Sequence, residues 1–370
     1  MLPAVVDSPL PAETDLSVYD VFTPTSGAVR SAIPRPALAR SIASALAVPG
    51  RQLLLYGRSG SGKSTALFAE LHRDELRHYA VIRCTPQTLI ATMLQSALVH
   101  FGLPAEQDES IALHLAAVEL GRRGVCVVVE DVHRLGQHER DRLFSAMKIF
   151  SDIGNQYPAV KIVAIAAVES PQALGMIDSE FSSRIAEIRV PEMSLTELET
   201  IVRDGGDLLN IDTTHVASFI AHRAGGMPGI AHQLALESFM DAGIYSKSTE
   251  RESLPSSATI HAVALRLSEM PHHVRARFDA ALESKLARGD VERVLDALSM
   301  FDPEGVFIDD LVEYVSSDGG GNRMSYIPGI VTDLARADRG AIVDRLPHDR
   351  VRFTEPLLHS YWTMISQQIE

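Results

Sequence analysis

The stretch Gln52-Leu-Leu-Leu-Tyr-Gly57-Arg-Ser-Gly-Ser-Gly62-Lys63-Ser64-Thr65 decides the fold of this chain. Its first part, from Gln52 to Tyr56, is a short apolar run ended by a glycine, which predicts a buried strand. Its second part matches GxxxxGK[ST] in full and leads into a helix. This strand–loop–helix context separates a phosphate-binding loop from a chance match, the alternative being a flexible Gly/Ser loop. The stretch therefore predicts a loop that holds a nucleoside triphosphate.

Each residue type in the loop has a chemical reason. The glycines let the backbone wrap so that successive N–H groups point at the β-phosphate, and the following helix adds its positive N-terminal dipole. Lys63 would span the β- and γ-phosphates, and the Ser64 hydroxyl would ligate Mg²⁺. We therefore expect ATP and Mg²⁺ as ligands, with a nucleotide-binding set of Gly57, Arg58, Ser59, Gly60, Ser61, Gly62, Lys63, Ser64 and Thr65.

A second motif, Val125-Cys-Val-Val-Val-Glu130-Asp131, is a hydrophobic strand that ends in two acids. Phosphoryl transfer needs one acid for the hydration shell of Mg²⁺ and one to position or deprotonate the attacking water. We assign Glu130 to the metal and Asp131 to the water. The commoner order is Asp-Glu, and the shorter aspartate side chain predicts slow hydrolysis. Alternatively, Asp131 caps the next helix.

Four further polar residues are weaker candidates. His133 follows the acid pair and would either sense the nucleotide state or pair with a carboxylate. Glu169 and Ser170 follow the apolar strand that ends at Ala167, where a γ-phosphate sensor could sit. Arg184 precedes a last short strand, where it would act as a catalytic arginine finger or sensor, or form a surface salt bridge.

Apolar strands alternate with helical patterns throughout this region, which predicts a parallel α/β sheet of the P-loop NTPase type. The predicted strands are 52–56, 80–83, 125–129, 161–167 and 185–190, and the predicted helices are 36–47, 87–101, 110–122 and 139–155.

After Pro191 the pattern becomes purely helical. Ser194-Leu-Thr-Glu197 fits a capping box, and the double glycine of Gly225-Gly-Met-Pro228-Gly ends one helix before proline starts the next. This turn is either a plain helix connection or one that places the next helix against the nucleotide. The expected domains are an arm at 1–30, a P-loop core at 31–191, a helical lid at 192–245, a linker with a helical segment at 246–288, and a final module at 289–370.

The composition sets outer limits on function. The chain has 370 residues, 46% of them apolar and 22% charged, with a net charge of −14. Apolar stretches are too short to span a membrane, and the first residues do not resemble a secretory signal, so we expect a cytoplasmic protein. The acidic balance disfavours a dedicated nucleic-acid binder. Cys84 and Cys126 lie in or beside apolar strands, which predicts buried thiols.

Taken together, these motifs resemble the AAA+/STAND group of prokaryotic P-loop ATPases over about Thr23 to Gly243. In that group the segment before the first helix packs on adenine, so the resemblance implies that Arg35 lines the base pocket. The Gly-Met-Pro turn is similar to the lid motif of STAND ATPases, which implies that Pro228 contacts the nucleotide. Many AAA+ proteins carry an arginine just after the position of Gly229. This chain lacks it, which favours a switch over a fast motor.

The last part of the chain, about Val291 to Trp362, looks like a winged helix. The expected elements are helices 308–315 and 324–337 and a hairpin formed by 341–346 and 350–353. Residues 287–370 contain 15 acids and 8 arginines and no lysine, so their net charge is 8 − 15 = −7. Neutralising phosphates requires several basic residues on one face. DNA binding is therefore possible but not favoured over protein contact.

The expected function is a slow regulatory ATPase that switches self-association, or binding of a partner effector protein, in bacterial defence or signalling. The alternative is a DNA-handling ATPase resembling transposition regulators or replication initiators. ATP-dependent, salt-sensitive DNA binding would discriminate the two.

Overall fold

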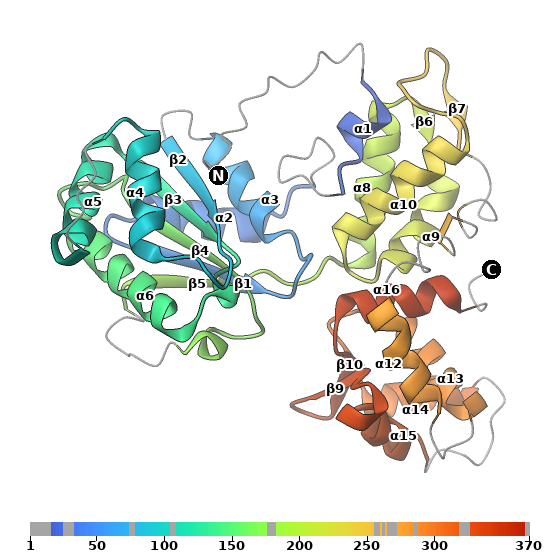
Figure 1. The fold of residues 1–370 in the computed structure, drawn as a ribbon. Coiled ribbons are helices and arrows are strands. Elements are labelled where there is room, and N and C mark those ends of the chain that lie inside the picture. Colours follow the sequence, from blue (N-terminus) through green and yellow to red (C-terminus); the bar gives the residue numbers. More distant parts are fainter. Residues whose placement is uncertain are drawn as a thin grey trace. The chain divides into compact units, whose positions relative to one another are not determined.

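The computed structural model describes most of the chain and divides it into two compact units (Figure 1). Among the described residues, the first unit spans 34–191, and the second joins the segment before residue 34 to the chain from residue 192 onward. The described residues are 16–24, 33–73, 78–103, 109–175, 183–254, 260, 263–264, 272–283, 288–317 and 326–366.

The first unit is built on a five-stranded sheet whose order is β2-β3-β4-β1-β5. All of its strand pairs are parallel, so the predicted parallel α/β sheet is confirmed. Its elements are α2 (Pro36–Ala47), β1 (Gln52–Gly57), α3 (Lys63–Arg73), β2 (His78–Arg83), α4 (Ile90–His100), α5 (Glu109–Arg123), β3 (Val125–Glu130), η2 (Val132–Arg134), α6 (Gln137–Asp152), β4 (Lys161–Ala167), η3 (Pro171–Leu174) and β5 (Ile185–Arg189).

Strand β3 shows why the sheet is covered on both faces. Successive side chains of a strand point to opposite faces, and every residue of β3 is buried. Val125, Val127 and Val129 pack into the core formed with α4, α5 and α6. Cys126 and Val128 pack into the core formed with α2 and α3. The two cysteines of the chain are both buried and free, as predicted.

Most predicted elements of this unit are present with small shifts at their ends. Helix α2 has the predicted bounds, whereas α4 begins at Ile90 instead of Gln87. The reason lies in a turn before α4, where the Thr88 hydroxyl accepts a hydrogen bond from the backbone N–H of Thr85 at 2.8 Å. Threonine side chains that bind nearby backbone groups favour turns over helix interiors.

The second unit contains the helices expected as a lid. The capping box at Ser194 is present, with Glu197 bonding back to the Ser194 N–H at 2.8 Å. Elements up to the C-terminal module are α1 (Val18–Val21), α8 (Leu195–Leu208), β6 (Ile211–Asp212), α9 (Thr214–Ala224), α10 (Pro228–Asp241) and β7 (Glu252–Ser253).

Residues 16–24 pack into these helices, although the sequence predicts an extended arm. Phe22 is fully buried, and its ring lies 5.2 Å from that of Phe239 on α10. A side chain at Gly205 of α8 would meet the Phe22 ring at 2.5 Å. A four-residue helix is too short to show a periodic pattern, which explains why the sequence did not reveal it.

The C-terminal module has a small antiparallel sheet of order β8-β10-β9 with helices around its own core. The predicted hairpin is present, because Arg350 pairs with Leu346 and Phe353 with Val343. Its elements are α12 (His272–Leu282), α13 (Arg288–Ser299), β8 (Val306–Phe307), α14 (Ile308–Ser317), α15 (Ile327–Leu334), η5 (Ala337–Arg339), β9 (Val343–Leu346), β10 (Arg350–Phe353) and α16 (Pro356–Ile365).

Helix α16 joins this module to the lid helices within the second unit. The Ser360 hydroxyl donates to the carbonyl of Ala224 at 2.5 Å, and the Thr363 hydroxyl donates to the carbonyl of Arg223 at 3.2 Å. These carbonyls belong to the last turn of α9, where the helix itself supplies no donor. Gly225 follows with a φ of 55°, and a side chain there would meet Ser360 Oγ at 2.7 Å. The lid turn and α16 are thus fitted to each other.

Two expectations extend beyond what the structure describes. The helical segment predicted from Ile260 to Leu286 falls partly outside the described residues, which include α12. Residues 318–325, which contain the predicted start of the helix at Met324, also lie outside them. Within the described part of the chain, helices long and apolar enough to cross a membrane are absent.

Candidate active site

The loop after β1 has the backbone that a phosphate cradle requires. Gly57 has a φ of 148°, and a side chain there would lie 2.2 Å from the carbonyl oxygen of Val190. Gly60 and Gly62 have φ values of 80° and 86°, in the left-handed region that other residues rarely adopt. Ser59 and Gly60 form the exposed tip, while Ser64 and Thr65 lie in the first turn of α3.

Two polar groups inside this loop fit a missing anion. The Lys63 side chain is buried, and its ammonium donates to the carbonyls of Gly57 at 3.0 Å and Arg58 at 2.7 Å. Ser61 is 1% exposed, and its hydroxyl has no hydrogen-bond partner among the described residues. A buried hydroxyl without a partner is costly. A phosphate oxygen would satisfy both groups.

The structure brings the predicted metal ligands together. The Ser64 hydroxyl donates to Glu130 Oε1 at 2.5 Å, which joins the first turn of α3 to the end of β3. Glu130 is 6% exposed and ends β3. Its other oxygen, Oε2, accepts from Arg83 Nε at 2.9 Å. A hydroxyl and a carboxylate are the hard oxygen donors that Mg²⁺ prefers, so the pair fits this ion.

Arg83 is a site residue that the sequence reasoning missed. It ends β2 and sits directly opposite Glu130 in the parallel register of β2 and β3. Its side chain is 77% exposed apart from this contact. The sequence did contain one signal for Arg83, its position at the end of a predicted strand. Parallel strands end at the same edge of a sheet, so that end lies near Glu130.

Asp131 follows Glu130 in a left-handed conformation, with φ at 60° and ψ at 35°. Aspartate tolerates this conformation better than most residues. Its carbonyl accepts from Arg134 N–H at 2.9 Å, which closes the short helix η2. The side chain makes no capping bond to η2, contrary to the alternative that it serves as a helix cap. Asp131 is half-buried.

His133 connects the end of β3 to the end of β4. The backbone N–H of Ala167 donates to His133 Nδ1 at 3.1 Å. Burial lowers the pKa of His133; Lys63 and Arg134 also lower this pKa, while Asp131 acts in the opposite direction. The bond and the lowered pKa both favour the neutral ring with its proton on Nε2.

The other candidates beyond β4 have separate positions. Glu169 Oε1 lies 3.3 Å from Arg58 Nε, so this acid joins the end of β4 to the phosphate loop. The Arg58 side chain is almost fully buried at 4% exposure, whereas that of Glu169 is 51% exposed. Ser170 precedes η3 and makes no side-chain capping bond to it.

Arg35, which the resemblance assigns to the base pocket, contacts the phosphate loop and Pro191, and its contact with adenine stays a prediction. Its Nη1 donates to the carbonyl of Pro191 at 3.1 Å and lies 3.5 Å from the carbonyl of Ser61. The Arg35 guanidinium therefore bridges the phosphate loop and the segment that follows β5.

Arg184 does not join this site. It precedes β5, and its carbonyl accepts from Gln52 N–H at 2.9 Å, beside the start of β1. The phosphate loop begins five residues later, at the other end of β1, which is about 17 Å away at the usual rise of a strand. The Arg184 guanidinium binds Asp152 instead. A sensor role for Arg184 within its own chain is therefore wrong, because a residue before a parallel strand lies at the opposite edge.

Pro228 belongs to the second unit, where it is the first residue of α10 as predicted. Gly225 and Gly226 before it have φ values of 55° and 84°, so the double glycine does end α9 in left-handed turns. Further along α10, His232 is 4% exposed, and burial lowers its pKa to about 4. Contact between Pro228 and nucleotide stays a prediction.

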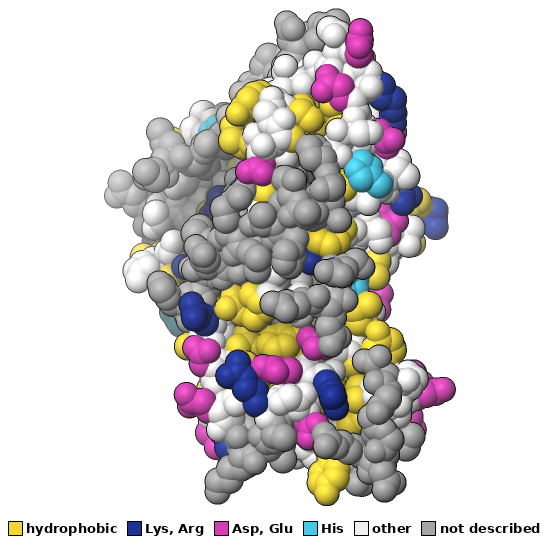
Figure 2. All heavy atoms as spheres, turned by 90° about the vertical axis from the view of Figure 1, so that its right-hand side faces the viewer, with side chains coloured by type: hydrophobic (Ala, Val, Ile, Leu, Met, Phe, Trp, Pro, Cys, Tyr) yellow, Lys and Arg dark blue, Asp and Glu magenta, His cyan; other side chains and the backbone are white. Residues whose placement is uncertain are grey.

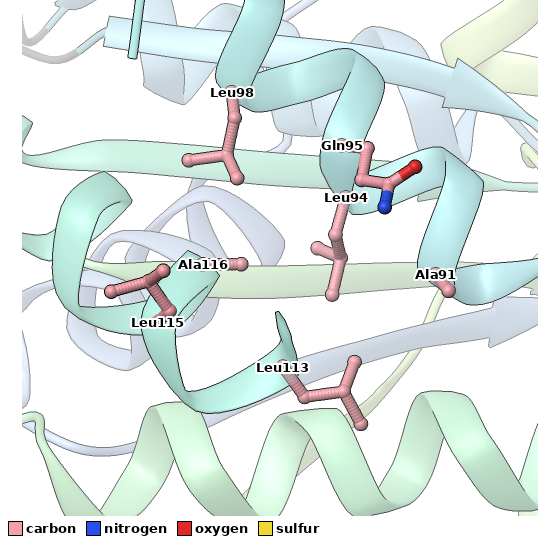
Figure 3. A pocket seen from close by; sticks show the side chains of 7 residues that line it. All are labelled: Ala91, Leu94, Gln95, Leu98, Leu113, Leu115 and Ala116. Carbon is pink, nitrogen blue, oxygen red and sulfur yellow. The ribbon is translucent and has the colours of Figure 1, made fainter. Parts of the chain in front are cut away.

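A separate pocket of the first unit lies between α4 and α5 (Figure 3). Among the described residues that line it, the amide of Gln95 is the single polar side chain, and titratable groups are absent. Such a lining is unsuited to a phosphate. It comprises Ala91, Leu94, Gln95, Leu98, Leu113, Leu115 and Ala116.

Comparison with known proteins agrees with this geometry. Residues 49–173 match the AAA domain. The Holliday junction branch migration complex subunit RuvB of Orientia tsutsugamushi (strain Ikeda) is 30% identical over 191 residues, which cover 48% of this chain and 58% of that protein. The chain thus spans 58% of the length of this curated relative, and the protein of strain Boryong matches equally.

Two solved structures share the fold across nearly the whole chain. A Walker-type ATPase of Pyrococcus abyssi has a TM-score of 0.51 and 16% identity, and the match covers 90% of this chain and 96% of that one. The ORC2 protein of Aeropyrum pernix, in ADPNP-ADP complexes, has a TM-score of 0.51 and 16% identity, with coverage of 89% and 92%. Residues 49–173 of this chain thus match the AAA domain, and the chain has the α/β fold of P-loop ATPases.

Proposed function

We propose that this protein binds ATP with Mg²⁺ at the phosphate loop, hydrolyses it slowly, and acts as a nucleotide-dependent switch. The observation that carries the proposal is the contact of 2.5 Å between the Ser64 hydroxyl and Glu130 Oε1, beside the buried ammonium of Lys63. Three groups with the chemistry for triphosphate and metal are thereby gathered at one edge of the sheet.

Ser64 and Glu130 would hold the Mg²⁺ ion, Glu130 through the ion's hydration shell. When bound, the ion neutralises charge on the β- and γ-phosphate oxygens. Lys63 would exchange its bonds to the Gly57 and Arg58 carbonyls for phosphate oxygens. The Ser61 hydroxyl would gain the partner that it lacks among the described residues.

Asp131 would position the attacking water and accept its proton. Two features favour a slow reaction. Aspartate is one methylene shorter than the glutamate more common at this place, and Arg83 neutralises the neighbouring Glu130 through a contact of 2.9 Å. A misplaced base lowers the rate because the transfer requires a heavy-atom distance of about 2.6–3.2 Å.

The switch would be read out through the second unit. Ser360 and Thr363 of α16 bind the last carbonyls of α9, directly before the Gly-Gly-Met-Pro turn of the lid. A shift of the lid on ATP binding would therefore move the C-terminal module with it. We expect the output to be self-association or binding of an effector protein, in bacterial defence or signalling, as the STAND resemblance implies.

The test compares nucleotide states of the full chain. Wild type should bind ATP in a Mg²⁺-dependent manner and release phosphate slowly. Asp131→Asn should keep ATP affinity and lose about 100-fold or more in phosphate release, the usual worth of a general base. Size in solution, or capture of a defined partner, should differ between ADP and a slowly hydrolysed ATP analogue. Identical behaviour in both nucleotides would contradict the switch.

A DNA-handling ATPase is the second candidate, and the relatedness to RuvB, a Holliday junction branch migration complex subunit, favours it. Charge counts against it. On the face drawn in Figure 2, basic and acidic side chains are interspersed and do not gather by sign. The described arginines of the hairpin already have protein partners. Arg350 donates to the carbonyls of Glu304 and Gly305, and the Arg345 guanidinium lies 3.7 Å from the Asp349 carboxylate.

DNA affinity at several salt concentrations decides between the two candidates. A protein that neutralises Z phosphates has a slope of about −0.9Z in log affinity against log salt. Binding that requires ATP and falls steeply with salt would favour the DNA-handling function. An affinity too weak to measure at physiological salt would favour the switch.

A further inference from the structure

The last residues of β4 and the two residues after it lack a neutral side chain that could donate a hydrogen bond to a nucleotide, and the first neutral donor, Ser170, comes only at the start of η3. The last residues of β4 are Ala166 and Ala167, and Val168 comes next. Glu169, the following residue, carries a negative charge and lies 3.3 Å from Arg58. A carboxylate repels an anionic phosphate, so this part of the chain is poorly suited to bind the terminal phosphate.

His133 lies against this same end of β4. Its Nδ1 accepts the backbone N–H of Ala167 at 3.1 Å, which uses the lone pair of that nitrogen. A neutral imidazole whose Nδ1 accepts must carry its proton on Nε2. The ring is therefore oriented by β4 and presents one fixed donor, Nε2–H. Because the side chain is only half-buried, that donor is not enclosed by the core.

The ring also lies close to the groups that would handle the terminal phosphate. It follows Glu130 by three residues, and the left-handed turn at Asp131 leads directly into the short helix η2 that holds it. Both the Lys63 ammonium and the Asp131 carboxylate influence its pKa through space. Lys63 is the residue expected between the β- and γ-phosphates, and Asp131 is the residue expected at the water.

We propose that the Nε2–H of His133 donates a hydrogen bond to the terminal phosphate of bound ATP. The proposal rests on the proposed function. It assigns the contact to His133, which follows the acid-bearing strand β3, because the side chains from Ala166 to Glu169 offer no neutral donor. Because ADP lacks this phosphate, the contact distinguishes ATP from ADP. It also links the phosphate through His133 to the backbone of Ala167 at the end of β4. Glu169, two residues further along the chain, contacts Arg58 of the phosphate loop.

His133→Asn separates this contact from the structural bond. The Asn side-chain oxygen lies roughly where Nδ1 does and can accept the Ala167 N–H, but the variant has no donor at the position of Nε2. We expect wild-type thermal stability and ADP affinity. Affinity for a slowly hydrolysed ATP analogue should fall about tenfold or more, as expected for a hydrogen bond to a charged group. His133→Ala should lose thermal stability as well, because Ala167 N–H loses its acceptor.

The ratio of ATP-analogue affinity to ADP affinity is the decisive measurement. An unchanged ratio in His133→Asn would overturn the proposal and leave His133 with only a structural role, the hydrogen bond from Ala167 N–H. If His133→Asn loses thermal stability, His133→Gln carries the test, since its amide nitrogen reaches roughly to the Nε2 position. It should then keep a ratio closer to wild type than His133→Ala does, and equal ratios would overturn the proposal. Wild type that binds neither nucleotide would instead refute the proposed function.

Discussion

The two ends of the parallel sheet each hold a buried lysine bonded to backbone carbonyls, yet only one end is suited to a ligand. At the end where the strands finish, Lys63 donates to the carbonyls of Gly57 and Arg58. At the end where they begin, Lys161 donates to the carbonyls of Val48 and Arg51. Lys161 is fully buried and Lys63 is 8% exposed.

The difference lies in what surrounds each ammonium. Lys63 sits in a glycine loop at a helix N-terminus, beside a hydroxyl of Ser61 that has no partner among the described residues. An anion can replace its carbonyl bonds with stronger ones, because opposite charges add Coulomb attraction to the hydrogen bond. Lys161 instead stands beside Gln52, whose side-chain oxygen accepts from Ile162 N–H at 2.7 Å. Burial of a lysine therefore does not by itself indicate a binding site.

The largest effect should come from Lys63→Ala. It removes the cation that would contact the β- and γ-phosphates, so ATP affinity should fall about 100-fold, near 3 kcal/mol. Thermal stability should change little, since the Lys63 ammonium donates to the carbonyls of Gly57 and Arg58 in its own loop. Titration with a fluorescent ATP analogue measures the affinity. Retained affinity would mean that the loop does not hold the triphosphate as proposed.

Lys161→Met should show the opposite pattern. The carbonyls of Val48 and Arg51 both lose the lysine donor, although that of Val48 keeps the Arg51 N–H at 3.3 Å, and an unsatisfied group costs about 1–3 kcal/mol when buried. Val48 is 40% exposed, so water can hydrogen-bond to its carbonyl in the variant. We therefore expect a loss of about 1–2 kcal/mol in unfolding free energy. Denaturant melts check the stability. The matched nucleotide titration should equal wild type, and a weakened ATP affinity would remove the contrast between the two lysines.

Arg83→Ala should have a smaller and favourable effect on the metal. It frees Glu130 Oε2 from the ion pair at 2.9 Å, and the side chain is 77% exposed. Exposed pairs contribute about 0–1 kcal/mol, so Mg²⁺ affinity in the presence of ATP should rise by no more than about fivefold. Magnesium dependence of phosphate release gives the value. Arg83→Lys is the control that keeps the charge, and a fall in metal affinity in Arg83→Ala would show that Arg83 supports the site.

The smallest effect should belong to Arg184→Ala. Its partner Asp152 is 63% exposed, and such surface pairs contribute about 0–1 kcal/mol. ATP affinity of the isolated chain should not change, because Arg184 lies at the edge of the sheet remote from the loop. A drop in phosphate release that appears only at high protein concentration would instead indicate an arginine finger supplied to a second copy.

The sequence predicted what local patterns determine and missed what strand register determines. Gly57 to Thr65, the acid strand and the Ser194 capping box are contiguous signals, and the structure contains each of them. The Arg83–Glu130 pair depends on which residue of β2 faces β3, which a motif does not contain. The position of Arg184 was accessible to reasoning, since parallel strands share one direction. The four-residue helix α1 carries too few residues for any periodic pattern.

The hydroxyl caps that α16 places on α9 have a consequence for how this chain can be shortened. A truncated chain that stops before Ser360 would lose more than a terminal module, because the carbonyl of Arg223 would lose the Thr363 hydroxyl and that of Ala224 would lose the Ser360 hydroxyl and keep the Met227 N–H at 3.0 Å. The boundary that the amino-acid pattern indicates near residue 246 therefore does not separate two energetically independent parts. A shortened protein intended to isolate the ATPase core would therefore have a destabilised lid. That defect would mask any effect that comes from losing the C-terminal module's own activity.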